Sequence, residues 1–197
     1  RVVPSEWVAS HSFSLVKGEV LDREKFRKKL IDNGYRSSPQ VSESGEYAVR
    51  GSLIDVFPVG SDNPIRIDFF DNEIETLRMF DVETQRSTQE VKEIRVLPGK
   101  EFLLDQSGVS RFRRQWRTEF GQFHDVDLYR DVSEGLPPPG IEYYLPLFHD
   151  RMELLADYFS EGTICVFDEN IQKTADQFWT SVEERHEALK DDTNRPV

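Results

Sequence analysis

Cysteine is almost absent from this sequence. Cys165 is the only one among 197 residues, so no disulfide can form within the chain. It lies in the apolar run 163–167, where we expect a buried and unreactive thiol. Long apolar runs are also missing: none approaches the ~20 residues that cross a bilayer, and the first residues show no signal-peptide pattern. We therefore expect a cytoplasmic protein without membrane contact.

Positive charge is scarce as well. The chain has 25 Lys and Arg against 37 Asp and Glu, which gives a net charge of −12. Binding of nucleic acid needs clustered cations, because contacts with the phosphate backbone supply much of the affinity. A free-standing nucleic-acid-binding module is therefore disfavoured, although salt-sensitive binding of DNA would revive that alternative.

Recognisable catalytic and metal-binding patterns are missing too. Asp168 and Glu169 follow the run 163–167, as acidic pairs do in ATPases that hold Mg²⁺, but the phosphate-binding pattern GxxxxGK[ST] does not occur. The histidines are scattered without the spacing of metal ligands; they are His11, His124, His149 and His186. We therefore predict no catalytic residue, no metal and no cofactor in these residues, and no enzymatic activity.

The most informative stretch that is present covers residues 46–80, which we interpret as three strands with turns at 58–64 and 71–72. Apolar residues alternate in its middle strand; they are Ile65, Ile67 and Phe69. Successive side chains of a strand point to opposite faces, so these three share a buried face. Arg66, Asp68 and Phe70 then lie on the opposite, polar face.

The same alternation places Arg50 opposite Tyr47 and Val49 on the preceding strand. An exposed aromatic ring beside arginines is a common composition for a partner-binding patch. If Arg50, Arg66 and Phe70 form such a site, Phe70 is its apolar anchor and the arginines make bidentate bonds to carboxylates of the partner. An ordinary solvated sheet face explains the pattern equally well, so both interpretations remain open at this point.

The fold class expected for the first half is α+β, a small helix-plus-antiparallel-sheet domain. Asp22 is a candidate N-cap, and the helix over 23–33 should end at Asn33-Gly34. Its apolar stripe packs on the sheet; the stripe consists of Phe26, Leu30 and Ile31. A last strand over 91–97 stops at Pro98, and Pro98-Gly99 is the best candidate for a domain boundary.

The second half changes period and is predicted to be α/β. Apolar residues at three- and four-residue steps predict a helix that ends at Gly121 and another that starts near Asn170. The run 163–167 suits a buried parallel strand. A single strand cannot close a sheet, so further strands must come from outside this chain. The sequence also lacks an initiator methionine, so we expect a piece of a longer protein.

Several motifs of the sequence carry a resemblance to a known family. They are EYAVRG at 46–51, IDVFP at 54–58, RIDFFD at 66–71, EIE at 73–75, FD at 80–81 with TQR at 84–86, GIEY at 140–143 and LPLF at 145–148. Together they closely resemble the UvrB-homology module of bacterial transcription-repair coupling factors (Mfd). The first motifs are similar, more loosely, to domain 2 of the excision-repair protein UvrB.

The resemblance implies a domain organisation and a site. Residues 12–97 would be domain 2, which binds the damage-recognition protein UvrA, and 98–197 would be domain 1b, part of a degenerate helicase-like α/β domain. Residues 1–11 would be a linker or a strand belonging to domain 1. The positions that contact UvrA in the family, two arginines and a phenylalanine, fall on Arg50, Arg66 and Phe70.

The resemblance also implies an adaptor function. The fragment would recruit UvrA in transcription-coupled nucleotide excision repair without catalysis of its own, and a C-terminal domain of the parent would mask its UvrA-binding face. The parent would use ATP and Mg²⁺, and would bind RNA polymerase and double-stranded DNA through regions outside this fragment. The alternative is a fragment of UvrB itself, the DNA-loading, ATP-dependent subunit, which predicts a nucleotide-binding loop upstream.

Overall fold

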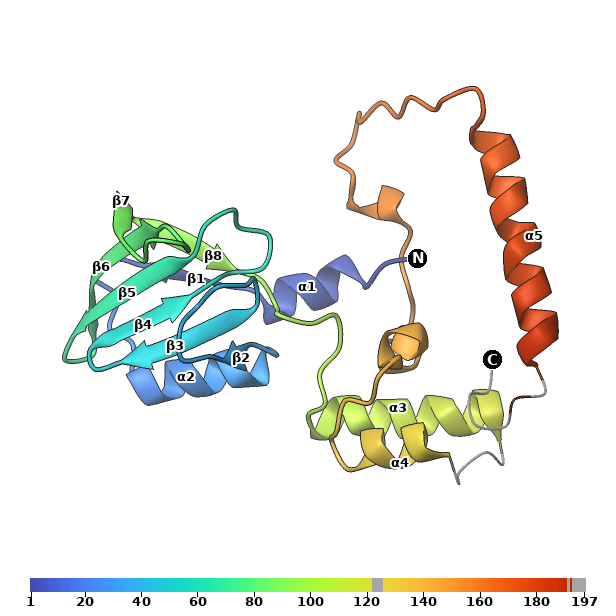
Figure 1. Ribbon diagram of the computed structural model, residues 1–197, viewed down its shortest axis with the longest axis horizontal. Helices are drawn as coiled ribbons and strands as arrows, with labels where there is room; N and C mark the ends of the chain where they lie inside the picture. Colours follow the sequence, from blue (N-terminus) through green and yellow to red (C-terminus); the bar gives the residue numbers. More distant parts are fainter. Residues whose placement is uncertain (122–125, 191, 193–197) are drawn as a thin grey trace. The chain divides into compact units, whose positions relative to one another are not determined.

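The computed structural model describes residues 1–121, 126–190 and 192, and the chain divides into two compact units. The sheet unit comprises Val3–Leu103, and the helical unit comprises Arg1–Val2 with Leu104–Val197. Figure 1 shows the elements of both units along the chain. The structure thus divides the chain at Leu103, whereas the sequence predicted a boundary at Pro98. Residues 98–102 stay with the sheet unit because Gly99 donates to the carbonyl of Asn33 and Phe102 is buried.

The sheet unit is built around a six-stranded sheet in the order β2-β3-β4-β5-β6-β7. Its strands are β2 (Arg36–Ser37), β3 (Glu46–Arg50), β4 (Leu53–Val56), β5 (Ile65–Phe70), β6 (Glu73–Phe80) and β7 (Ser87–Val91). β2 and β3 are parallel, and all the other neighbours are antiparallel. A separate two-stranded ribbon pairs β1 (Phe13–Val16) with β8 (Glu93–Val96). The strand expected over 91–97 is therefore divided between β7 and β8. The expectation of three strands over 46–80 is also wrong, because the first of them is a hairpin: β3 and β4 pair through a turn at Gly51, whose φ is 61°.

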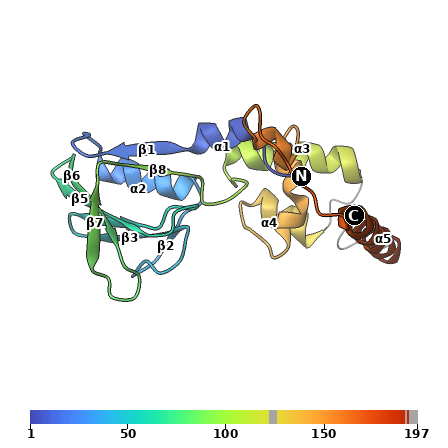
Figure 2. The ribbon, with the colours of Figure 1, turned by 90° about the horizontal axis from the view of Figure 1, so that it is seen from above.

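Helix α2 (Arg23–Asp32) covers one face of this sheet, as the stripe of apolar residues predicted (Figure 2). Asp22 caps its start by accepting a hydrogen bond from the backbone N–H of Lys25, and the chain leaves the helix through Asn33 and Gly34, whose φ is 83°. Phe26 and Leu30 are fully buried against the sheet, whereas Ile31, the third residue of the predicted stripe, is 48% exposed. Burial of Phe26 and of Leu30 contributes about 2–3 kcal/mol each to the stability of the unit.

The core-facing residues of β5 confirm the predicted alternation. Ile65, Ile67 and Phe69 are buried, and the ring of Phe69 lies 6.4 Å from that of Phe26. Leu15 from β1 and Val96 from β8 join the same core. The α+β class predicted for this part of the chain is confirmed.

Within residues 1–11, where a linker or a strand of domain 1 was expected, Val2 forms an isolated antiparallel bridge with Glu153, and the residues from Ser5 onward form a helix that was not expected. Helix α1 (Ser5–His11) begins directly after Pro4, a residue that is compatible with a helix start because it lacks the N–H that the first turn leaves unpaired. The ring of Trp7 stacks on that of His11 one turn later, with centroids 4.3 Å apart. The contact joins residues at i,i+4 spacing, but the surrounding residues do not repeat apolar positions at helical steps, so the sequence pattern did not predict this helix.

The helical unit has an aromatic core. Its helices are α3 (Gln106–Phe120), α4 (Asp127–Ser133), the 3-10 segments η1 (Ile141–Phe148) and η2 (Leu155–Tyr158), and α5 (Ile171–Leu189). Phe112 and Trp116 of α3 are fully buried, and Phe148 of η1 stacks on Phe112 at 5.1 Å. The predicted end of α3 at Gly121 is confirmed.

The parallel strand predicted over 163–167 is wrong. These residues are irregular and exposed; Ile164 is 87% and Val166 90% accessible. Cys165 is exposed too, so the expectation of a buried thiol is also wrong. A β-branched run becomes a strand only where a neighbour satisfies its backbone groups, and the described residues of the helical unit contain no sheet beyond an isolated bridge from Val2 to Glu153.

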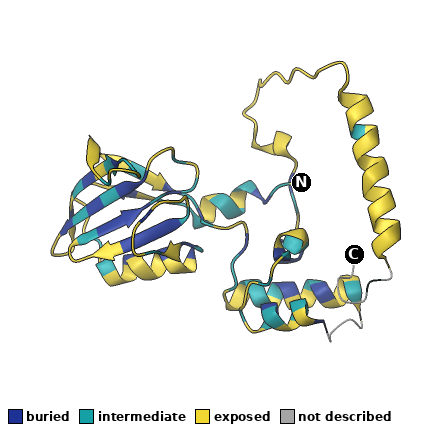
Figure 3. Ribbon diagram, viewed as in Figure 1, coloured by how far each residue is buried: buried dark blue, intermediate teal, exposed yellow. Residues whose placement is uncertain are grey.

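Helix α5 has the predicted position and apolar stripe, but none of its described residues is buried (Figure 3). His124 and most of the tail that follows Lys190 lie outside the described residues.

Candidate partner-binding surface

The predicted site lies on the face of the sheet opposite α2, here called the outer face. The antiparallel register aligns Ala48, Asp55 and Arg66 in one row across β3, β4 and β5, and Arg50, Leu53 and Asp68 in the next. Residues directly opposite one another on paired strands point to the same face. Arg50 and Arg66 therefore share the outer face, and Phe70 joins them two residues after Asp68 on β5.

Phe70 is largely exposed, with 70% of its surface accessible. It ends β5, directly before Asp71, whose positive φ of 54° turns the chain into β6. Ile65, Ile67 and Phe69 fill the core-facing positions of β5, and the alternation of the strand points the Phe70 ring away from the core. A ring of this size in water is an available apolar anchor.

Arg50 is exposed at the end of β3, and its guanidinium donates to the carbonyl of Pro39 at 3.3 Å. This single hydrogen bond to a neutral acceptor leaves most of its N–H groups facing solvent. Arg50 can therefore make the bidentate bond to a carboxylate that the sequence pattern predicted.

Arg66 differs, because its fork is already occupied within the chain. Nε donates to Asp55 Oδ1 at 2.8 Å and Nη2 donates to Asp55 Oδ2 at 2.9 Å, while the guanidinium lies 4.7 Å from the centre of the Phe80 ring. Hydrogen bonds with Asp55 raise the pKa of Arg66 above its ordinary value. Only 18% of the Arg66 side chain is accessible, against 1% for Asp55. The expected bidentate contact of Arg66 with a partner is therefore replaced by one with Asp55.

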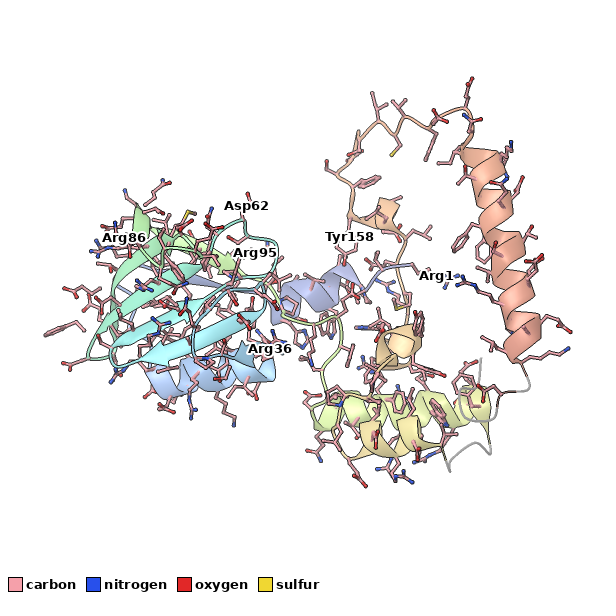
Figure 4. The ribbon with its side chains drawn as sticks, in the orientation of Figure 1. Arg1, Arg36, Asp62, Arg86, Arg95 and Tyr158 are labelled. Atoms are coloured by element: carbon pink, nitrogen blue, oxygen red, sulfur yellow. The ribbon has the colours of Figure 1, made fainter. Side chains whose placement is uncertain are left out.

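Arg66 also holds the loop between β6 and β7. Its Nη1 donates to the carbonyl of Gln85 at 3.2 Å. Gln85 has a positive φ of 58°, and its amide donates to the carbonyls of Val41 and Val82. The exposed Arg86, labelled in Figure 4, follows at the base of this loop, where its carbonyl accepts a hydrogen bond from the Asp81 N–H directly before β7. The loop is thus pinned to the outer face through Arg66, a role that strand alternation did not reveal.

Asp55 and Phe80 are the other residues that the sequence analysis missed. Asp55 interrupts the apolar run 53–57, and a carboxylate in such a run indicates a buried partner. Its place opposite Arg66 depends on the register between β4 and β5, which the sequence pattern leaves open.

A second buried carboxylate, Glu46, lies at the start of β3. It accepts hydrogen bonds from the backbone N–H groups of Ser42 and Glu43, at 2.9 and 3.0 Å, and from Arg36 Nη2 at 2.9 Å. Figure 4 labels Arg36, which lies on the edge strand β2. These bonds, chiefly the one from Ser42, lower the pKa of Glu46 to about 2.

The depressed pKa of Glu46 predicts an acid-sensitive sheet unit. Because the folded-state pKa lies below the ordinary 4.5, the stabilisation is present above about pH 4.5 and is lost as the pH falls towards 2. We expect about 3 kcal/mol to be lost over this window. Denaturation at stepped pH measures it: Glu46→Gln should flatten the profile, whereas Glu43→Gln, at an exposed residue, should not. Equal pH profiles for the unaltered chain and Glu46→Gln would contradict the assignment.

The described residues offer no candidate metal centre: no group of three or more His, Cys, Asp or Glu is placed to hold an ion. No helix in the described part of the chain is long and apolar enough to span a membrane. Asp168 and Glu169 are exposed before α5, where Asp168 accepts a hydrogen bond from the backbone N–H of Asn170 at 2.8 Å. That contact is an ordinary one at a helix start.

Comparison with known proteins identifies the family of the chain. Residues 13–102 match the family described as UvrB interaction domain. Over its full length the chain is 42% identical to the transcription-repair-coupling factor of Haemophilus influenzae and 41% identical to that of Escherichia coli K12, and over 96% of its length it is 30% identical to that of Myxococcus xanthus. The chain spans 17% of the length of each of these relatives. It belongs to the family of transcription-repair-coupling factors, of which it is a segment that contains a UvrB interaction domain.

Proposed function

We propose that this segment is a docking module that recruits UvrA during transcription-coupled nucleotide excision repair, and that it performs no catalysis itself. The observation that carries the proposal is that the exposed Phe70 and the exposed Arg50, whose guanidinium has only a neutral acceptor, share the outer face of the sheet within the UvrB interaction domain. An apolar anchor flanked by a cation has the composition of a binding hot spot.

Arg66 has a divided role in this proposal. It offers UvrA the N–H groups that Asp55 and Gln85 leave unused, and it fixes the outer face on which Arg50 and Phe70 stand. The site residues proposed for UvrA are therefore Arg50, Arg66 and Phe70, with Asp55 as a positioning residue.

The remainder of the protein would supply the other activities. ATP hydrolysis with Mg²⁺, translocation on double-stranded DNA and binding of RNA polymerase in the bacterial cytoplasm are assigned to regions outside this segment, as is the domain that masks the outer face. The alternative of a UvrB fragment is not proposed, because the similarity over the full chain is to coupling factors, in which the match to a UvrB interaction domain is also expected.

Isothermal titration of the chain with purified UvrA tests the proposal. We expect saturable binding by the unaltered chain and its loss in the double variant Arg50→Ala/Phe70→Ala, whose substitutions both lie at exposed positions. Absence of binding by the unaltered chain would overturn the proposed function. Equal binding by the double variant would overturn the site assignment alone.

A further inference from the structure

The turn before α2 extends the sheet beside Phe70. β7 pairs only with the 77–80 part of β6, which leaves the edge of β6 open near Glu73. The segment 18–21 fills this edge. Gly18 N–H donates to the carbonyl of Ile74 at 2.8 Å, Ile74 N–H donates to that of Glu19 at 2.9 Å, and Leu21 N–H donates to that of Asn72 at 2.6 Å.

This pairing places Val20 in one row with Phe70. Val20 lies opposite Glu73 in an antiparallel bridge, and Glu73 lies opposite Phe70 across the β5–β6 turn. Directly paired residues share a face, with Cβ atoms about 4.5–5.5 Å apart, so Val20 and Phe70 are about 10 Å apart on the outer face. The alternation of the segment agrees, because Leu21 packs against the core while Val20 is 76% accessible.

The composition of this row is typical of a binding surface and unusual for one that contacts only solvent. Two large apolar side chains, Val20 and Phe70, flank one carboxylate at the exposed end of a sheet. Glu73 is exposed, and Arg50 on the same face has only a neutral acceptor. A complementary partner would therefore offer an apolar pocket for each anchor, a cation for Glu73 and a carboxylate for Arg50.

We infer that the UvrA-docking surface continues from Phe70 across Glu73 to Val20. Val20 is a second apolar anchor, and Glu73 selects a cationic residue of UvrA. The inference rests on the function proposed above, and the occupant is UvrA because the row is continuous with Phe70 through paired strands. It adds Val20, before α2, and Glu73, at the start of β6, to a surface otherwise formed by β3 and β5.

Titration of UvrA with Val20 variants tests this extension. Val20→Ser removes the apolar side chain, and Val20→Thr keeps the β-branched shape that suits the extended segment. We expect binding about tenfold weaker for Val20→Ser, and weaker binding for Val20→Thr, because a side chain of this size contributes about 1.5 kcal/mol or more when it is buried. Ile31→Ser is the matched control, since Ile31 is 48% exposed on α2 of the same unit and should leave binding unchanged.

Glu73 is tested by charge. Glu73→Lys should weaken binding more than Glu73→Gln, with the difference shrinking as salt is added, because the reversed charge would face a cation. If Phe70→Ala loses binding while both Val20 variants bind as tightly as the unaltered chain, the extension is refuted and the proposed function stands. If the unaltered chain does not bind UvrA, both are refuted.

Discussion

Phe70→Ala should weaken the binding of UvrA at least about 30-fold while leaving the free energy of unfolding within about 0.5 kcal/mol of the original value. The two effects separate because the ring is 70% accessible and makes no contribution to the buried core. A central aromatic anchor contributes 2 kcal/mol or more to an interface, which corresponds to about 30-fold in the dissociation constant.

The measurement for Phe70 is a pair of titrations and a pair of denaturation curves. Tyr143→Ala is the matched control, because Tyr143 is an aromatic residue of the helical unit that is 83% accessible. If nonspecific hydrophobic contact with exposed aromatic rings caused the binding, both substitutions would weaken it equally. A loss confined to Phe70→Ala identifies a specific site, and an unchanged affinity of that variant would remove Phe70 from it.

Asp55→Ala should destabilise the sheet unit by about 3 kcal/mol, the largest stability effect that we expect from a single outer-face residue. The substitution leaves the Arg66 guanidinium without its carboxylate beneath Phe80 and the β6–β7 loop. Breaking one side of a buried ion pair costs more than the pair itself contributes, because the remaining charge stays desolvated. Because Arg66 retains some exposure, the expected value is at the low end of the range for such pairs.

Hydrogen exchange of the β4 and β5 amides measures this effect within the sheet unit. Asp68→Ala is the control: Asp68 is a carboxylate of the neighbouring row whose hydrogen bond is with the exposed Ser52 hydroxyl, and it should cost well under 1 kcal/mol. The double variant Asp55→Leu/Arg66→Met should recover most of the lost stability, because an apolar pair can replace a buried ion pair. Exchange rates unchanged by Asp55→Ala would contradict the positioning role.

The same geometry changes how substitutions of the arginines should be compared. Arg50→Ala removes an exposed group and should affect binding alone, whereas Arg66→Ala also releases the β6–β7 loop and leaves the buried Asp55 carboxylate unpaired. A loss of UvrA binding by Arg66→Ala would therefore combine the loss of a contact with UvrA and the loss of the support that Arg66 gives to the outer face. Arg50 and Phe70 are the cleaner test of contact.

Local pattern was sufficient for much of the sheet unit. The alternation in 65–70 identified its buried and exposed faces, and Asp22 with Asn33-Gly34 marked the ends of α2, because side-chain parity and capping depend on residues that are close in sequence. The motifs that surround Arg50, Arg66 and Phe70 also identified the family. For these features, residues that are close together in the sequence fix both the local backbone geometry and which side chains are buried.

The sequence by itself therefore determined which side chains share the outer face and where α2 begins and ends. Only the tertiary structure decided that Arg66 binds Asp55 and that Val20 lies beside Glu73, because strand register and edge pairing join residues that are far apart in the chain. The same reason explains the irregular run 163–167: its residues favour a strand, but a strand forms only where another backbone satisfies its hydrogen bonds.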